Sequence, residues 1–179
     1  MFVILSGSSG AGKNTIIKFL LEKNKNFKIF KTCSTRGKRP EELENNAYYH
    51  LTREEFENKI KNGDFFEFEE IHGNLYGTLN ETIDLIRKND FHYIKDIGVE
   101  GQISFKKRLP KDVKIVSIFL KVPKEELIRR LKERGEKEIE KRMERFDYEN
   151  SLIHNFDYVI ENETIDGTIK EIEKIIAEN

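Results

Sequence analysis

The chain has 179 residues, of which 37% are hydrophobic and 36% charged, and its 32 basic side chains nearly balance its 33 acidic ones. This length predicts one domain that can bury a core without disulfides or metals. The near-neutral charge argues against a dedicated nucleic-acid binder, and the lack of a long apolar run argues against a membrane span, so neither nucleic acid nor membrane is an expected partner.

Two further features concern the expected location of the protein. The single cysteine, Cys33, excludes an internal disulfide and suits a reducing compartment. The opening segment "MFVIL" is apolar but lacks the length and basic prefix of a signal peptide. We therefore expect a cytoplasmic protein, and the sequence leaves its oligomeric state open.

The first predicted elements are a strand and a helix joined by a glycine-rich turn. Phe2 to Leu5 is a short continuous apolar run, which is typical of a buried parallel strand. Residues 15–22, "TIIKFLLE", carry apolar side chains at helical spacing. The sequence therefore begins with the order strand, loop, helix.

The turn between them, "GSSGAGKNT", has the frame of a phosphate-binding loop: Gly7, four residues, then Gly12 and Lys13. Backbone N–H groups of such a loop bind phosphate oxygens, and the helix N-terminus adds positive partial charge. The expected nucleotide-binding residues are Gly7, Ser8, Ser9, Gly10, Ala11, Gly12, Lys13, Asn14 and Thr15. The alternative is a glycine-rich turn with an exposed lysine. Asn14 departs from the motif, because that position usually offers a hydroxyl to magnesium.

Residues 32 to about 80 interrupt the pattern of strands and helices, and we interpret them as an insertion. Thr52 and Glu55 form a capping-box pattern for one helix, which is expected to end at Gly63. In "KTCSTRGKRP", Arg36 and Arg39 lie three residues apart. Two guanidinium groups suit a phosphate monoester because each can donate paired hydrogen bonds, whereas the alternative is a solvated run of charge.

The remainder of the chain alternates strands with helices. Strand-like runs at 91–97, 113–120 and 157–160 are each followed by a helical pattern, and Pro123 and Gly135 are expected at the first position and just beyond the end of one of these helices. This order predicts an α/β fold with a parallel sheet between helices on both faces. We expect a single domain over 1–179, with a core of 1–31 and 81–179.

Several motifs follow one another in a recognisable order. After the phosphate loop come "STRGKRP", "AYYHLTREEF", "GDFFEFEEIHGNLYGT", "DIGVEG" and "RRLKERG". In these motifs, between Phe2 and Asn162, the chain closely resembles the guanylate kinases, which are P-loop kinases of nucleoside monophosphates. The resemblance implies a P-loop kinase-type sheet, an inserted GMP-binding subdomain at about 32–80 and a short lid at about 134–142.

The resemblance also implies roles for individual residues. Arg36, Arg39, Tyr48 and Tyr76 would hold the phosphate of GMP. Glu67 corresponds to the glutamate that accepts hydrogen bonds from the guanine ring, with Thr32 and Thr78 as hydroxyl residues near the base. Lys13 corresponds to the lysine at the transferring phosphoryl group, and Asp96 to an acidic residue near magnesium. Arg134 and Arg142, with Arg130 and Arg145, correspond to lid arginines that close over the phosphoryl group. Without the resemblance, Asp96 would be read as a helix-capping residue and the arginines as solvated charges.

The implied reaction is transfer of the terminal phosphoryl group of ATP to GMP, giving ADP and GDP. Mg²⁺ would be bound through ATP phosphate oxygens and water, and no protein residue is assigned as its ligand. Two other functions remain open for this sequence: a non-catalytic binding module of the same fold, or a kinase that acts on another phosphorylated ribose compound. Gly98 motivates the second, because it replaces an aspartate that the family uses for the guanine amino group. The lid is also about three residues shorter than is common in the family.

Overall fold

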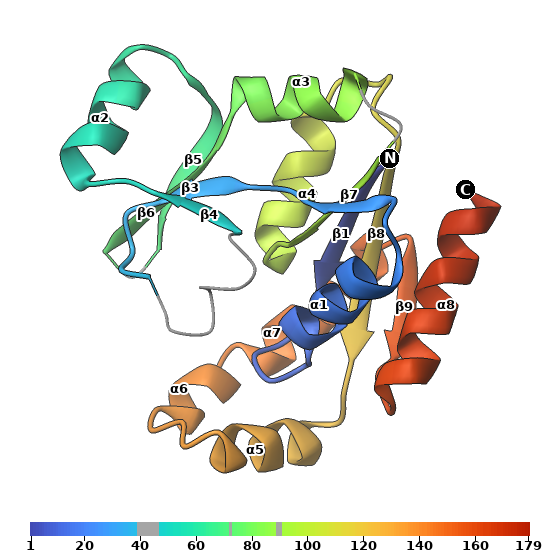
Figure 1. Ribbon diagram of the computed structural model, residues 1–179. Coiled ribbons are helices and arrows are strands. Elements are labelled where there is room, and N and C mark those ends of the chain that lie inside the picture. The colour runs from blue at the N-terminus through green and yellow to red at the C-terminus, as the bar shows by residue number, and fades with distance from the viewer. Residues whose placement is uncertain (39–46, 72, 89–90) are drawn as a thin grey trace. The chain divides into compact units, whose positions relative to one another are not determined.

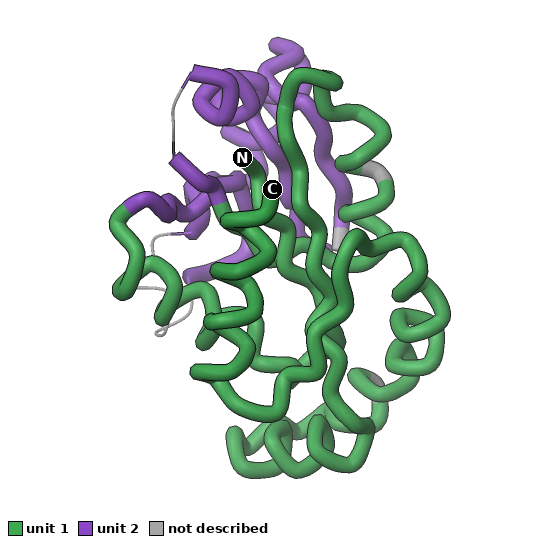
Figure 2. Tube along the Cα trace, turned by 90° about the vertical axis from the view of Figure 1, so that its right-hand side faces the viewer, with its two compact units in different colours: residues 1–25, 94–179 green, residues 26–93 purple. Residues whose placement is uncertain are grey.

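A computed structural model describes residues 1–38, 47–71, 73–88 and 91–179 of the chain (Figure 1). The chain divides into two compact units, one formed by Met1–Lys25 with Ile94–Asn179 and the other by Asn26–Tyr93 (Figure 2). The insertion expected at about 32–80 lies within the second unit.

A five-stranded sheet has the order β2-β7-β1-β8-β9, which is not the order of the strands in the sequence. Its strands are β1 (Phe2–Ser6), β2 (Phe27–Ile29), β7 (His92–Asp96), β8 (Ile115–Lys121) and β9 (Tyr158–Glu161). Strands β1 and β8 pair in parallel, as do β8 and β9. All five residues of β1 are buried, as its continuous apolar sequence predicts for a central strand. The predicted parallel sheet is confirmed.

Helices flank this sheet on both faces (Figures 1 and 2). The helices of the larger unit are α1 (Lys13–Lys23), α4 (Val99–Arg108), α5 (Lys124–Glu133), α6 (Ile139–Met143), α7 (Phe146–Ser151), the 3-10 helix η2 (Ile153–Asn155) and α8 (Ile165–Glu178). Helix α4 packs on β1, where the rings of Phe105 and Phe2 lie 5.4 Å apart between centroids. Helices α1 and α8 contact each other. The predicted covering of the sheet by helices is also confirmed.

Helix α5 begins one residue later than its sequence signals indicate. Pro123, expected at the first helical position, is instead the N-cap residue, with φ −56° and ψ 143°. The fixed φ of proline suits either position, but the extended ψ of Pro123 is not helical, so the helix starts at the next residue. Leu127 and Leu131 form the buried side of the helix, and Gly135 follows its end with a φ of 71°, as expected for a glycine terminator.

The second unit is built on a four-stranded sheet of order β4-β3-β6-β5. Its elements, besides β2 and the start of β7, are β3 (Thr32–Ser34), β4 (Tyr48–His50), α2 (Arg53–Lys61), β5 (Phe65–Ile71), β6 (Asn74–Leu79) and α3 (Asn80–Lys88). Cys33, Phe56, Leu75 and Leu79 form its buried cluster, so α2 covers one face of this sheet through Phe56. The predicted capping box of α2 is present, because the Thr52 side chain and Glu55 bond reciprocally.

Within the part of the chain that the structure describes, no helix has both the length and the apolar character needed to cross a membrane.

Candidate functional site

The loop between β1 and α1 requires glycine at three positions. Gly7, Gly10 and Gly12 have φ values of 145°, 89° and 87°, which L side chains rarely adopt. A Cβ atom at Gly7 would also lie 2.6 Å from the backbone oxygen of Leu120. The loop therefore packs directly on the end of β8, and any side chain at Gly7 would push it away.

Lys13 is the first residue of α1, and Gly12 is the N-cap. Among the described residues no side chain caps this helix, so its first N–H groups are available to an anion. The Lys13 Nζ donates to the backbone oxygens of Gly7, at 2.5 Å, and Ser8, at 3.2 Å, which holds the ammonium group inside the curl of the loop. Burial lowers the pKa of Lys13, and the nearby carboxylates of Asp96 and Glu149 oppose that shift.

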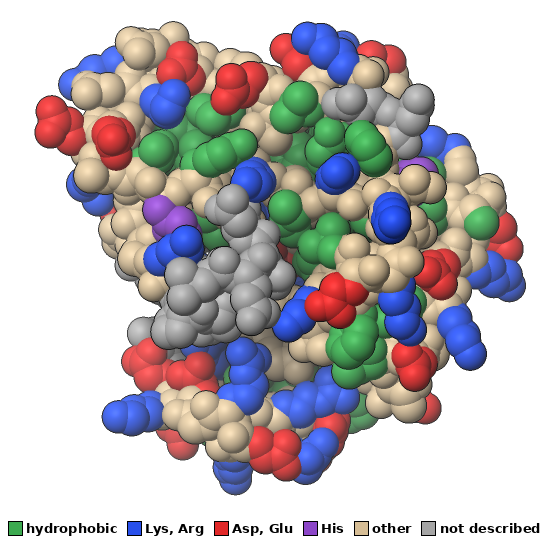
Figure 3. Space-filling view, in the orientation of Figure 1, with side chains coloured by type: hydrophobic (Ala, Val, Ile, Leu, Met, Phe, Trp, Pro, Cys, Tyr) green, Lys and Arg blue, Asp and Glu red, His purple; other side chains and the backbone are tan. Residues whose placement is uncertain are grey.

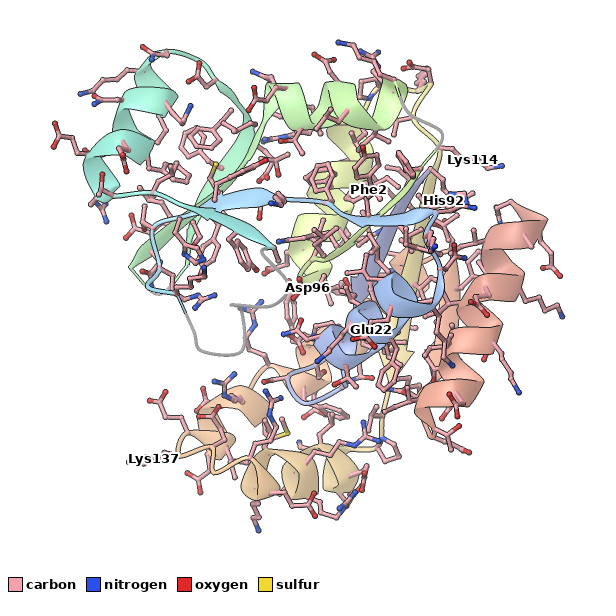
Figure 4. The ribbon with its side chains drawn as sticks, in the orientation of Figure 1. Phe2, Glu22, His92, Asp96, Lys114 and Lys137 are labelled. Carbon is pink, nitrogen blue, oxygen red and sulfur yellow. The ribbon has the colours of Figure 1, made fainter. Side chains whose placement is uncertain are left out.

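Asp96 lies at the end of β7, as expected, and is partly exposed (Figure 4). The end of β7 is joined to that of β1 by two hydrogen bonds. The Ile97 N–H donates to the Leu5 oxygen at 3.1 Å, and the Ser6 hydroxyl donates to the Ile97 oxygen. Because β1 leads into the phosphate loop, these bonds place Asp96 at the carboxyl edge of the sheet, where the loop and Lys13 begin.

Asn14 and Thr15 are exposed on the first turn of α1. The Ser8 side chain is buried, and its Oγ has no hydrogen-bond partner among the described residues. The Ser9 Oγ accepts a hydrogen bond from Arg142 at 2.9 Å. The loop thus reaches, through Ser9, a residue 133 positions later in the chain.

Of the expected lid arginines, the structure brings Arg142 to the loop. Besides Ser9, Arg142 contacts the Glu136 carboxylate at 2.6 Å, and its Nε is buried without a partner among the described residues. Arg134 instead is the C-cap residue of α5 and is exposed. Charged side chains of both signs gather on the surface over α5 and α6 (Figure 3). Lys137, in the turn between these two helices, is exposed (Figure 4).

Arg130, also expected among the lid arginines, lies close to the loop. A Cβ atom added to Gly12 would lie 3.9 Å from the Arg130 Nη1. Glu126 accepts from the Arg130 Nε at 2.8 Å and also from Arg129. The hydrogen bonds from Arg129 and Arg130 lower the pKa of Glu126 to about 2. Glu126 therefore stays ionised and fixes the direction of the Arg130 guanidinium.

A pocket of about 230 Å³ lies beside Arg130. Its lining includes Val122, Pro123, Glu126, Arg130, Asn162 and Glu163. Asn162 joins the pocket to the phosphate loop, because its side-chain amide donates to the Ala11 oxygen at 2.6 Å. The larger unit thus carries an anion-binding loop with an adjacent pocket.

In the second unit, most of the residues expected to bind GMP lie on the face of the sheet opposite the apolar cluster. Strand register pairs Thr32 with Tyr48, Ser34 with Tyr76 and Glu67 with Thr78. Residues paired in register point to the same side, and every second residue of a strand does so as well. The residues on this face include Thr32, Ser34, Tyr48, His50, Glu67, Tyr76 and Thr78, whereas Cys33, Leu75 and Leu79 point to the other.

Arg36, Tyr48 and Tyr76 form one group on this face. The Arg36 guanidinium carbon lies 5.7 Å from the centre of the Tyr48 ring, and the rings of Tyr48 and Tyr76 are 6.3 Å apart in an edge-to-face arrangement. The Arg36 Nη1 donates to the Gly37 oxygen at 2.9 Å. The guanidinium therefore lies close to the Tyr48 ring, which neighbours the Tyr76 ring, and the guanidinium and both phenol hydroxyls are groups that can donate to an anion. Arg39 lies outside the described residues.

Glu67 and Thr78 form a second group. The Thr78 hydroxyl donates to the Glu67 Oε1 at 2.6 Å, and Thr78 itself is fully buried. This bond orients the carboxylate, whose second oxygen can accept from a ligand. Gly77 lies between Tyr76 and Thr78, and a Cβ atom there would lie 2.8 Å from the Phe65 ring, so the strand backbone packs closely at this point.

A family model described as guanylate kinase matches residues 1–179. This chain belongs to the guanylate kinase family. Its relatives include the guanylate kinase of Prochlorococcus marinus subsp. pastoris, which is 37% identical over 178 residues, covering 97% of this chain and 95% of that protein. The guanylate kinase of Thermotoga maritima is 32% identical over 177 residues, covering 97% and 84%. Among solved structures, guanylate kinase from Anaplasma phagocytophilum has 30% sequence identity and a TM-score of 0.77, covering 99% of this chain and 85% of that one.

Membership of the guanylate kinase family makes this chain an enzyme, a nucleoside monophosphate kinase, and confirms the resemblance seen in its motifs. Three residues were not expected from the sequence: Glu126, which binds Arg130; Asn162, which binds the loop; and Thr168, which binds Asn162. Glu126 had one signal, its position four residues before Arg130 on the same helix. Asn162 and Thr168 had none, because the bond from Asn162 to the Ala11 oxygen and the bond from Thr168 to Asn162 both depend on the fold.

Proposed function

We propose that this protein transfers the terminal phosphoryl group of ATP to the phosphate of GMP, giving ADP and GDP. The observation that carries the proposal is that one chain of the guanylate kinase family has both kinds of anion-binding group. The larger unit has a glycine loop with Lys13, and the second unit has Arg36 beside two tyrosines. Phosphoryl transfer requires the two nucleotides to meet in line, so residues of both units must contribute to turnover.

On the donor side, the loop N–H groups and Lys13 bind the ATP phosphates. Arg142, already in contact with Ser9, neutralises charge that develops on the transferring group. Arg134 is proposed for the same role, which requires its exposed side chain to turn toward the phosphates. The pocket lined by Val122, Pro123 and Arg130 adjoins the loop and is suited to the nucleoside end of the donor.

On the acceptor side, Arg36, Arg39, Tyr48 and Tyr76 hold the GMP phosphate. The Glu67 carboxylate, oriented by Thr78, accepts hydrogen bonds from the guanine ring N–H and amino group, while Thr32 supplies a further hydroxyl. Adenine lacks that pair of donors, so AMP would leave the carboxylate unpaired. A nucleotide phosphate is already an anion, so the reaction needs no general base.

Mg²⁺ would enter with ATP. No group of three or more His, Cys, Asp or Glu side chains that could hold a metal ion occurs among the described residues. The available oxygen donors, the Asp96 carboxylate and the exposed Asn14 amide, suit an ion bound mainly by phosphate oxygens and water. When bound, the ion supplies charge neutralisation between the phosphates.

The deciding experiment measures ADP release from ATP with GMP, dGMP, IMP and AMP as acceptors. We expect GMP to have the highest kcat/KM and AMP to be a poor substrate. Phosphorylation of another acceptor with no reaction of GMP would overturn the proposal, and so would GMP binding without any turnover, which is the result expected of a non-catalytic module.

Gly98 adds a test of base selectivity to the same assay. A Cβ atom at this position would meet no described atom within 4 Å, so Gly98→Asp can be accommodated in the fold. If the family role of an aspartate here applies, Gly98→Asp raises the preference for GMP over IMP. An unchanged GMP-to-IMP ratio would show that guanine is recognised without a group at position 98.

A further inference from the structure

Asn162 occupies a buried position directly after β9. It is 6% exposed, and its backbone N–H continues the sheet by donating to the Lys121 oxygen at 2.9 Å. Buried amide side chains usually have partners for both their donor and acceptor groups. The contacts of Asn162 therefore indicate what this residue is for.

Both ends of the Asn162 amide are paired. Its Nδ2 donates to the backbone oxygen of Ala11 at 2.6 Å, and its Oδ1 accepts from the Thr168 hydroxyl at 2.8 Å. The orientation of the amide is settled by chemistry, because the Ala11 oxygen can only accept and so requires the NH₂ group. Thr168, on α8, is 2% exposed. A helix on one side thus fixes an amide that holds the phosphate loop on the other.

The bond to Ala11 determines the direction of a loop peptide. In a trans peptide the C=O of one residue and the N–H of the next point in opposite directions. With the Ala11 oxygen held by Asn162, the Gly12 N–H points away from Asn162. The same side chain leaves little room for a side chain at residue 12, because a Cβ atom at Gly12 would lie 3.0 Å from the Asn162 Nδ2.

Asn162 also contacts the second part of the donor region. Its backbone oxygen accepts from the Arg130 Nη2 at 3.4 Å, and Asn162 and Arg130 both line the 230 Å³ pocket. One residue therefore touches the loop that binds phosphate, the arginine beside that loop, and the adjoining pocket.

We infer that Asn162, supported by Thr168, is a positioning residue for the ATP site: it fixes the Ala11–Gly12 peptide in the direction that phosphate binding requires. The inference rests on the proposed binding of ATP at this loop. Asn162 acts through the backbone of the loop, so its loss should impair use of ATP much more than use of GMP.

The test compares Asn162→Ala and Asn162→Asp with the wild type. Asn162→Asp retains the shape and the bond from Thr168 but cannot donate to Ala11. Loss of one buried hydrogen bond corresponds to about a tenfold change. We therefore expect both variants to raise the KM for ATP about tenfold or to lower kcat by a similar factor, with the KM for GMP within about twofold of the wild-type value.

A second pair of variants tests the support from α8. Thr168→Val removes the hydroxyl at similar volume and should change the KM for ATP or kcat in the same direction as the Asn162 variants. Thr168→Ser retains the hydroxyl and should keep both values near those of the wild type. Asn155→Ala is the matched control, since the Asn155 Nδ2 also donates to a backbone oxygen, that of Leu152 at 3.0 Å. It should leave both KM values unchanged.

Thermal unfolding and calorimetry with GMP establish that each variant is folded. If the KM values for ATP and GMP rise together, in proportion to the loss of Tm, the role of Asn162 is merely structural and the inference is overturned. A normal KM for ATP and a normal kcat in Asn162→Asp would overturn it as well. A wild-type enzyme that does not turn over ATP and GMP would refute the proposed function instead, so the two failures are distinguishable.

Discussion

Lys13 is the residue on which the donor site depends most. Its ammonium group lies inside the loop, against the Gly7 and Ser8 oxygens, and belongs to the larger unit, whereas the proposed GMP residues belong to the second. We expect Lys13→Ala to lower kcat at least a hundredfold, because transition-state charge on the phosphoryl group is no longer neutralised. Calorimetry should show GMP affinity within about threefold of the wild-type value, a change of less than 1 kcal/mol. An equal loss of GMP affinity would contradict the assignment of Lys13 to the donor side.

Glu136 is the counter-ion of Arg142 beside the phosphate loop. The pair is 2.6 Å apart and partly shielded from solvent, with the Glu136 side chain 25% exposed. A donor phosphate and Glu136 compete for the same guanidinium, so removing the negative charge should favour the phosphate. We expect Glu136→Gln to lower the KM for ATP severalfold at low ionic strength, with a smaller effect in 0.5 M salt because of screening.

The control for this prediction is Glu133→Gln. Glu133 pairs with Arg129 at 2.5 Å and is 60% exposed, so it has the same charge but a different partner. It should leave the KM for ATP unchanged. A higher KM in Glu136→Gln would mean that the carboxylate holds Arg142 in place for ATP rather than competing with ATP.

The residues differ in how well the sequence predicts them. The glycines of the phosphate loop were predictable because a positive φ is a local requirement that favours glycine, and the motif places glycines at a fixed spacing. The role of Glu67 came from family resemblance, since a glutamate in "FFEFEE" otherwise reads as an ordinary strand residue. Asn162 was not predictable at all, because the Ala11 oxygen that it binds is 151 residues away in the chain.

At the scale of elements, the boundaries of α2 and α5 were predictable from local sequence signals, whereas the order of the strands was not. The capping box of α2 and its end near Gly63 follow from side-chain types at fixed spacing, and the structure confirms both. The start of α5 differs by one residue, since a proline is compatible with the cap as well as with the first turn. Strand order was beyond local signals, because β7 and β8 both follow β1 in the sequence but lie on either side of it in the sheet.

Helix α2 depends on its cap because it is short and buries one large side chain, Phe56. The Thr52 Oγ1 accepts from the Glu55 N–H at 3.2 Å, and the Thr52 N–H donates to the Glu55 Oε2 at 2.7 Å. We expect Thr52→Ala to reduce the free energy of unfolding by about 1 kcal/mol, the usual cost of removing an N-cap hydroxyl. Urea unfolding measures this, and Thr52→Ser, which retains the hydroxyl, should lose much less. A midpoint unchanged in Thr52→Ala would mean that packing of Phe56 alone holds the helix.

For the molecule as a whole, Asp157 ties together three elements of the larger unit. It stands directly before β9 and accepts from Lys106 on α4 at 2.6 Å and from the backbone N–H and hydroxyl of Ser117 on β8 at 2.8 and 2.7 Å. Partial burial opposes ionisation, but these hydrogen bonds outweigh it and hold the pKa of Asp157 below its ordinary value. The folded state therefore binds a proton at Asp157 less readily than the unfolded chain does.

The sign of the pH dependence follows from this lowered pKa. The contribution of Asp157 to stability is complete above the unfolded pKa of about 3.9 and is lost as the pH falls through the lower folded value. We expect Asp157→Asn to lower Tm at pH 7 and the difference from wild type to narrow steadily below pH 4. Asp147→Asn is the control, because Asp147 forms an exposed ion pair with Lys124 and is 82% exposed. A Tm difference that stays constant from pH 7 to pH 2.5 would show that Asp157 acts through packing or neutral hydrogen bonds rather than through its charge.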